Sequence, residues 1–198
     1  MTGAERDRRE DGRPEQARPR DRTGRPLPYD TTGVPLTEDH DPSTVEEALE
    51  LGIQLWNQQR FFEAHECLEA VWHASPEADQ DLWQGVIQVA VAGVHIQRGN
   101  PVGALALLAR AEERLAAYPA EHRGIDVEAA RATCRDLTDQ IERAGVDETN
   151  LPGPFPAVCG GAWFTPDPAA LEPPSEPTAV PDEPVWLAAG QPRRPRQR

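Results

Sequence analysis

The chain has no lysine: all 20 of its basic residues are arginine, and they face 34 aspartates and glutamates. The net charge is therefore -14 over 198 residues, with the acidic excess concentrated between residues 38 and 150. A surface this acidic repels phosphate backbones at every distance that salt screening allows. We therefore expect the central part of the chain not to bind nucleic acid.

Cysteine and long apolar runs are also scarce. The three cysteines, Cys67, Cys134 and Cys159, are an odd number without a Cys-x-x-Cys pair, and the arginine-rich start has no apolar signal-peptide core. Both features argue against a secreted disulfide framework and favour the reducing cytoplasm. The longest uncharged stretch, between Asp81 and Arg98, is too short and too polar to span a bilayer. We expect a cytoplasmic protein without a membrane segment.

Proline is nearly absent from the middle of the chain, where only 3 of the 21 prolines fall between residues 43 and 150. Because proline interrupts helices and strands, this block is the part that can fold regularly. Residues 1–42 are predicted to be a disordered arm, and residues 151–198 a proline-rich tail. Large aromatic residues in the tail are expected to pack back on the folded block or to dock on a protein partner; they are Phe155, Trp163, Phe164 and Trp186.

Apolar residues in the central block recur with the spacing of amphipathic helices. We predict five helices, over residues 44–58, 61–73, 76–98, 101–118 and 127–144. No segment alternates β-branched and polar residues as a half-buried strand would. The predicted fold class is therefore an all-α, compact bundle of about five helices between extended tails.

The helix ends carry recognisable capping signals. Ser43, Ser75, Asn100 and Asp126 each precede a predicted helix as an N-cap residue. Gly99 can adopt the left-handed conformation that ends a helix, so the third and fourth helices should form a tight antiparallel hairpin.

The helix over residues 61–73 carries a group of polar side chains. His65 and Glu69 fall on the same side of this helix one turn apart, beside Trp72 at the edge of its apolar face. Glu63 and Glu66 are expected to point further toward solvent. On the next helix Gln84, Gln88 and His95 form one stripe that continues to Arg98, within a helix that is otherwise apolar almost all round. Because this stripe has no charge before Arg98, we predict a buried polar seam.

If the two helices face each other, these side chains form a pocket for a metal or a small molecule. His65, Glu69 and His95 would hold a divalent metal such as zinc or iron. Glu66 would be a general base and His95 an acid in hydrolytic or other acid-base chemistry. Four further side chains would bind the small molecule, namely Gln84, Gln88, Arg98 and Trp72.

A second hypothesis needs no catalysis. The same side chains can form a structural hydrogen-bond network inside a helical interaction or scaffold module whose acidic faces and aromatic tail engage a partner. The residues alone leave open whether the protein is an enzyme.

Several separated motifs resemble a known bacterial family. They are Phe61-Phe62-Glu63-Ala64-His65-Glu66-Cys67-Leu68-Glu69, Gln84-Gly85-Val86-Ile87-Gln88, His95 and Arg98-Gly99-Asn100. In this order, over about residues 46–118, the chain is similar to the family catalogued as domain of unknown function 309. The resemblance implies a small, soluble, all-helical domain without an established reaction. The family's signature polar positions then fall on His65, Glu66, Glu69, Gln84, Gln88, His95, Arg98 and Asn100.

Overall fold

The computed structural model describes residues 19–38, 40–147 and 149–158. The predicted all-α bundle is confirmed, and its helices are α1 (Val45–Asn57), α2 (Phe61–His73), α3 (Glu77–Gln97), α4 (Pro101–Leu115) and α5 (Val127–Ala144). A hairpin of two short strands, β1 (Glu121–His122) and β2 (Ile125–Asp126), precedes α5. Strands of two residues are too short to leave an alternating pattern, so the sequence did not predict them.

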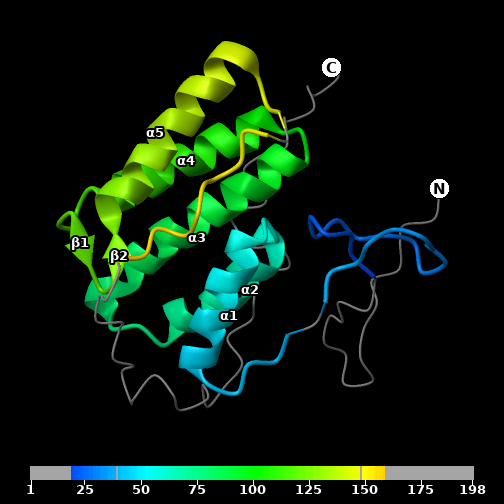
Figure 1. Ribbon diagram of the computed structural model, residues 1–198, viewed down its shortest axis with the longest axis horizontal. Helices are drawn as coiled ribbons and strands as arrows, with labels where there is room; N and C mark the ends of the chain where they lie inside the picture. Colours follow the sequence, from blue (N-terminus) through cyan, green and yellow to red (C-terminus); the bar gives the residue numbers. More distant parts are fainter. Residues whose placement is uncertain (1–18, 39, 148, 159–198) are drawn as a thin grey trace, which may run out of the picture.

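Helix α3 lies between the α1–α2 pair and the α4–α5 pair (Figure 1). Two glycines allow its neighbours to approach closely: a Cβ atom at Gly93 would lie 2.8 Å from the ring of Phe61 on α2, and one at Gly85 would lie 2.9 Å from Leu115 on α4. These contacts explain why an almost uniformly apolar helix is stable here, since each side is covered by another helix. No helix in the described ranges is long and apolar enough to span a membrane.

The β hairpin is held to the start of α3 by a buried carboxylate. Asp79, which is 1% exposed, lies 2.7 Å from His122 Nε2 through one oxygen and accepts a 2.7 Å hydrogen bond from Arg123 Nε through the other. Because a buried carboxylate is costly unless it is paired, these bonds fix the hairpin against the helix.

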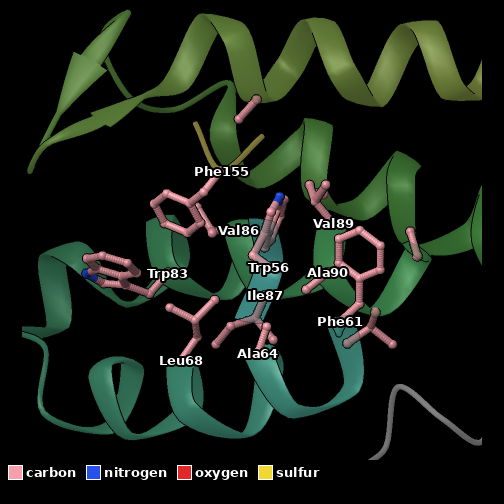
Figure 2. Packing of buried hydrophobic residues seen from close by; sticks show 14 of the residues in the cluster. Trp56, Phe61, Ala64, Leu68, Trp83, Val86, Ile87, Val89, Ala90 and Phe155 are labelled. Carbon is pink, nitrogen blue, oxygen red and sulfur yellow. The ribbon is translucent and has the colours of Figure 1, made fainter. Parts of the chain in front are cut away.

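The segment after α5 returns along the bundle to the β hairpin (Figure 1). Phe155 is 6% exposed and packs edge-on against Trp56 of α1, with ring centroids 5.3 Å apart (Figure 2). Trp56 Nε1 donates to the carbonyl of Gly153 at 2.8 Å, and two residues after Phe155, Ala157 bridges Ile125 of β2. This segment therefore ties α1 to the hairpin. Trp163, Phe164, Trp186 and Cys159 lie outside the described residues.

Several helix ends differ from the predictions by a few residues. The N-cap of α1 is Thr44, whose hydroxyl accepts from the amide of Glu47 at 3.1 Å, and not Ser43. Both residues are good caps, and only the path of the chain decides between them. Ser75 does not cap α3, because its hydroxyl donates to the carbonyl of Val71 at 2.7 Å.

Helix α4 shows both a confirmed and a wrong prediction. Asn100 is its N-cap, as expected, and accepts from the amide of Gly103 at 3.0 Å, while Gly99 has the expected positive φ of 66°. The helix ends at Leu115, three residues earlier than Tyr118. Val102 in its first turn is 67% exposed, whereas Gly103 and Ala104 beside it are buried.

Part of the predicted disordered arm lies against the bundle. Residues 19–38, which we call the N-terminal strap, contain isolated β bridges between Arg20 and Pro26 and between Asp21 and Leu36. The strap contacts the bundle through a buried glycine, backbone hydrogen bonds and arginine side chains. A composition with few large apolar residues gives no sign of such contacts, which is why it suggested disorder.

Removal of the Phe155 ring should destabilise the bundle. Phe155→Ala leaves a cavity beside Trp56 and is expected to lower the free energy of unfolding by roughly 3 kcal/mol. Chemical denaturation followed by tryptophan fluorescence measures this. The control is Val102→Ala on the exposed first turn of α4, which should change stability by less than about 0.5 kcal/mol. Equal effects of the two substitutions would contradict a role for the segment in tying α1 to the hairpin.

Candidate functional site

The predicted site residues occupy two neighbouring helices joined by a short turn, an arrangement that makes these helices antiparallel. Helix α2 carries His65, Glu66, Glu69 and Trp72, helix α3 carries Gln84, Gln88 and His95, and Arg98 follows α3 directly.

The two amides of the predicted seam differ in their surroundings. Gln84 is half-buried, and its Oε1 accepts a 2.7 Å hydrogen bond from Arg114 Nε on α4. Gln88 is 5% exposed, and its Oε1 has no hydrogen-bond partner within the described residues. Gln84 is thus engaged on the α4 side of α3, away from the pocket that the sequence suggested.

His95 also faces α4. Its Nδ1 lies 2.8 Å from Asn100 Nδ2, and a Cβ atom at Gly103 would lie 2.2 Å from the same nitrogen. Because Asn100 Oδ1 is occupied by the amide of Gly103, the Asn100 nitrogen donates to Nδ1 and the proton of His95 sits on Nε2. Burial and the nearby charge of Arg98 lower the pKa of His95 to about 4. At neutral pH this imidazole is uncharged.

His65 is equally buried, on the other side of α3. It is 4% exposed, its Nδ1 donates to the carbonyl of Phe62, and its ring packs edge-on against the Phe62 ring at 4.8 Å. Burial lowers the pKa of His65 to about 4, with smaller contributions in the same direction from the positive charges of Arg98 and Arg20 and an opposing one from the hydrogen bond to Phe62. His65 therefore supports Phe62 as a neutral group.

The remaining residues of α2 do not complete a metal site. Glu66 is exposed, Glu69 is half-buried with a pKa that burial raises, and the indole nitrogen of Trp72 has no hydrogen-bond partner in the described part. Among residues 19–38, 40–147 and 149–158, no group of three or more His, Cys, Asp or Glu side chains is close enough to hold a metal ion. The structure does not bring His65, Glu69 and His95 together as a ligand set.

Arg98 is engaged by the N-terminal strap instead. Its Nη2 donates to the carbonyl of Thr23, and Arg25 Nη2 donates to the carbonyl of Arg98 at 2.8 Å. Arg98 and the strap thus exchange hydrogen bonds, each supplying one guanidinium and one main-chain carbonyl. Residues 20–26, which make these contacts, are called the N-terminal turn below.

The apex of the N-terminal turn rests on Phe62 of α2. Gly24 is buried with a φ of 78°, and a Cβ atom there would lie 2.1 Å from the Phe62 ring. The guanidinium of Arg20 lies over the same ring, 5.8 Å from its centroid. Only glycine fits both the backbone conformation and the space at this apex.

Asp21 holds the turn in shape. Its Oδ1 accepts from the amide of Thr23 at 2.9 Å, from the hydroxyl of Thr23 at 2.7 Å and from the amide of Arg25 at 3.0 Å. Burial alone would raise the pKa of Asp21, and these hydrogen bonds bring it below its usual value. The Asp-x-Thr-Gly sequence is a recognisable turn signal, although it does not reveal where the turn docks.

Glu63 anchors the other end of the strap, contrary to the prediction that it points toward solvent. Its side chain is fully buried, its Oε1 accepts from the amide of Glu38 at 2.8 Å, and Arg60 Nε donates to Oε2 at 2.7 Å. Burial would raise the pKa of Glu63, but the hydrogen bond from Arg60 keeps it below its usual value. The i, i+3 spacing of Arg60 and Glu63 was the signal available in the sequence.

Comparison with known proteins finds relatives of the helical core. Residues 49–107 match the family model described as Domain of unknown function (DUF309). The protein YpuF of Bacillus subtilis (strain 168), itself uncharacterised, is 40% identical over 67 residues, which is 33% of this chain and 37% of that relative. No solved structure matches.

The matched range contains Phe62, Glu63 and Arg98, which contact the strap, and excludes the N-terminal turn. The receiving face thus lies in the part of the chain that matches the family model. Residues 49–107, which run from within α1 to within α4, are thus the part of this chain that is similar to the DUF309 family.

Proposed function

We propose that this protein is a non-enzymatic interaction module whose Phe62 and Arg98 form a face that binds a tight turn of polypeptide. In this chain the N-terminal turn occupies that face. The observation that carries the proposal is the reciprocal pair of hydrogen bonds between Arg98 and the turn, through the carbonyls of Thr23 and Arg98. Charge-assisted hydrogen bonds of this kind are among the stronger ones in proteins.

Shape contributes the second part of the recognition. The Phe62 ring offers a flat apolar surface that a glycine apex can approach and that a side chain would block. Arg20 adds a cation over the same ring, a contact worth roughly 0.5–1 kcal/mol at an exposed site. The face therefore favours a turn with glycine at its apex and arginine on both sides.

The net negative charge of the protein attracts an arginine-containing segment from a distance, whereas the positive charge of Arg98 repels it at the face. The net charge of -14 attracts a basic segment. At the face itself, burial and the charges of Arg25 and Arg20 lower the pKa of Arg98, while Asp21 partly offsets them. Directed hydrogen bonds, rather than an ion pair with Arg98, must then hold the turn in place.

The histidines support a binding role over a catalytic one. General acid-base catalysis works best with a pKa near the working pH, whereas His65 and His95 have pKa values of about 4. Their neutral rings instead shape the face: His65 packs against Phe62, and His95 fixes Asn100 where α3 passes into α4.

A methyl group at the apex should release the N-terminal turn. In Gly24→Ala the added Cβ meets Phe62, an overpacking cost of about 1–3 kcal/mol, so hydrogen exchange of amides in residues 20–27 should accelerate roughly tenfold or more. Gly33→Ala is the matched control: its φ is also 78°, but a Cβ there meets nothing within 4 Å. Equal acceleration in both variants would argue against docking on Phe62.

The buried histidines should make stability fall in acid. The unfolded chain takes up protons near the ordinary pKa of 6.5, whereas folded His65 and His95 do so only near 4, so the free energy of unfolding decreases as pH falls through this window. Each histidine contributes a slope of up to about 1.4 kcal/mol per pH unit. Urea denaturation at several pH values measures the slope. His65→Gln should reduce it and the exposed His73→Gln should not; identical slopes would show that His65 is not buried as a neutral group.

A further inference from the structure

A sequence similar to that of the N-terminal turn occurs earlier in the chain. Residues 20–26 read Arg-Asp-Arg-Thr-Gly-Arg-Pro, and residues 8–14, placed 12 residues earlier, read Arg-Arg-Glu-Asp-Gly-Arg-Pro. Four of the seven positions are identical. The identical pairs are Arg20 and Arg8, Gly24 and Gly12, Arg25 and Arg13, and Pro26 and Pro14.

Three of these identical positions make the side-chain-specific contacts with the bundle. Arg20 lies over the Phe62 ring, Gly24 rests on that ring, and Arg25 donates to the carbonyl of Arg98. The repeat therefore preserves each feature of the turn that the receiving face can distinguish.

The positions that differ do not use their side chains on the bundle. Arg22 is exposed, and Thr23 offers Arg98 only its main-chain carbonyl, which any residue can supply. The carboxylate of Asp21 accepts hydrogen bonds from Thr23 and Arg25 within the turn. Because Arg9 stands at the position of Asp21 in the first copy, that copy lacks these internal bonds and should be a weaker occupant.

We infer that the face of Phe62 and Arg98 is a receptor for the sequence Arg-x-x-x-Gly-Arg-Pro, and that residues 8–14 compete with residues 20–26 for it. The inference rests on the proposed function, since it requires that the face binds turns. One face cannot hold both copies, so the docking of one releases the other. The strap would then exchange between two registers that are 12 residues apart.

Chain length does not prevent this exchange. Glu63 holds the amide of Glu38, so the chain between the docked turn and this anchor begins after residue 26 in one register and after residue 14 in the other. This roughly doubles the loop, and the entropic cost of closing a loop rises only with the logarithm of its length. The contacts of the two turns therefore decide which copy is bound.

Full-length chains carrying Gly12→Ala, Gly24→Ala or both substitutions test the competition, with Gly33→Ala as the control. Fluorescein-labelled peptides of residues 7–15 and 19–27 are titrated into each chain and followed by anisotropy, after circular dichroism has checked the fold. Both peptides should bind the double variant. The dissociation constant of the 7–15 peptide should exceed that of the 19–27 peptide by a factor of about ten at most. Each single variant should bind at least threefold more weakly than the double variant, because its intact copy still occupies the face. Arg98→Gln in the double variant should abolish binding.

The outcomes separate the two proposals. If the 19–27 peptide binds the double variant and the 7–15 peptide does not, or if Gly24→Ala alone binds as tightly as the double variant, residues 8–14 are not an occupant and the competition is overturned. The proposed function then stands. If neither peptide binds a correctly folded double variant, or if Arg98→Gln leaves binding intact, the face is not a turn receptor and both proposals fall.

Discussion

The burial of residues 85–96 of α3 on every side is the constraint on which the rest of the structure depends. Each end of this helix is tied to a segment outside the helices. At the start, Asp79 binds the β hairpin through His122 and Arg123. At the end, Arg98 binds the N-terminal strap. The two attachments thus hold the β hairpin and the N-terminal strap at opposite ends of the same helix.

Several residues in the range that matches the family model either contact the strap or pack behind the residues that do. Phe62, Glu63 and Arg98, which lie in the matched range, contact the strap directly. The two histidines act behind them as neutral packing groups, one against Phe62 and the other against the turn between α3 and α4. A set of residues that suggests metal ligands and a general base is thus also consistent with a surface that binds the main chain of a polypeptide segment. Both interpretations need polar residues at fixed spacing. They can be distinguished only by the groups that these residues contact in the folded protein.

Glu63 and His95 show where inference from the residues reached its limit. Helical periodicity correctly placed them on α2 and α3. A helical-wheel projection, however, does not show how one helix is rotated about its axis relative to its neighbour. Glu63 was expected in solvent and is fully buried, because the strap and Arg60 cover it. His95 was expected to face His65 and is turned to α4, because Gly103 leaves space there. In both cases the deciding contact comes from a segment distant in the sequence.

The sequence by itself determined the all-helical class, the extent of the five helices to within a few residues, the caps at Asn100 and Asp126, and the similarity of residues 49–107 to the DUF309 family. These properties depend on local periodicity and on hydrogen bonds between near neighbours, which the order of residues encodes directly. Only the tertiary structure decided which polar side chains meet and that the strap docks on Phe62 and Arg98. It also decided that, within the described residues, no three His, Cys, Asp or Glu side chains lie close enough to hold a metal ion. Those contacts join residues far apart in the chain, and their free energy depends on how helices rotate and pack against one another, for which the sequence has no local signal.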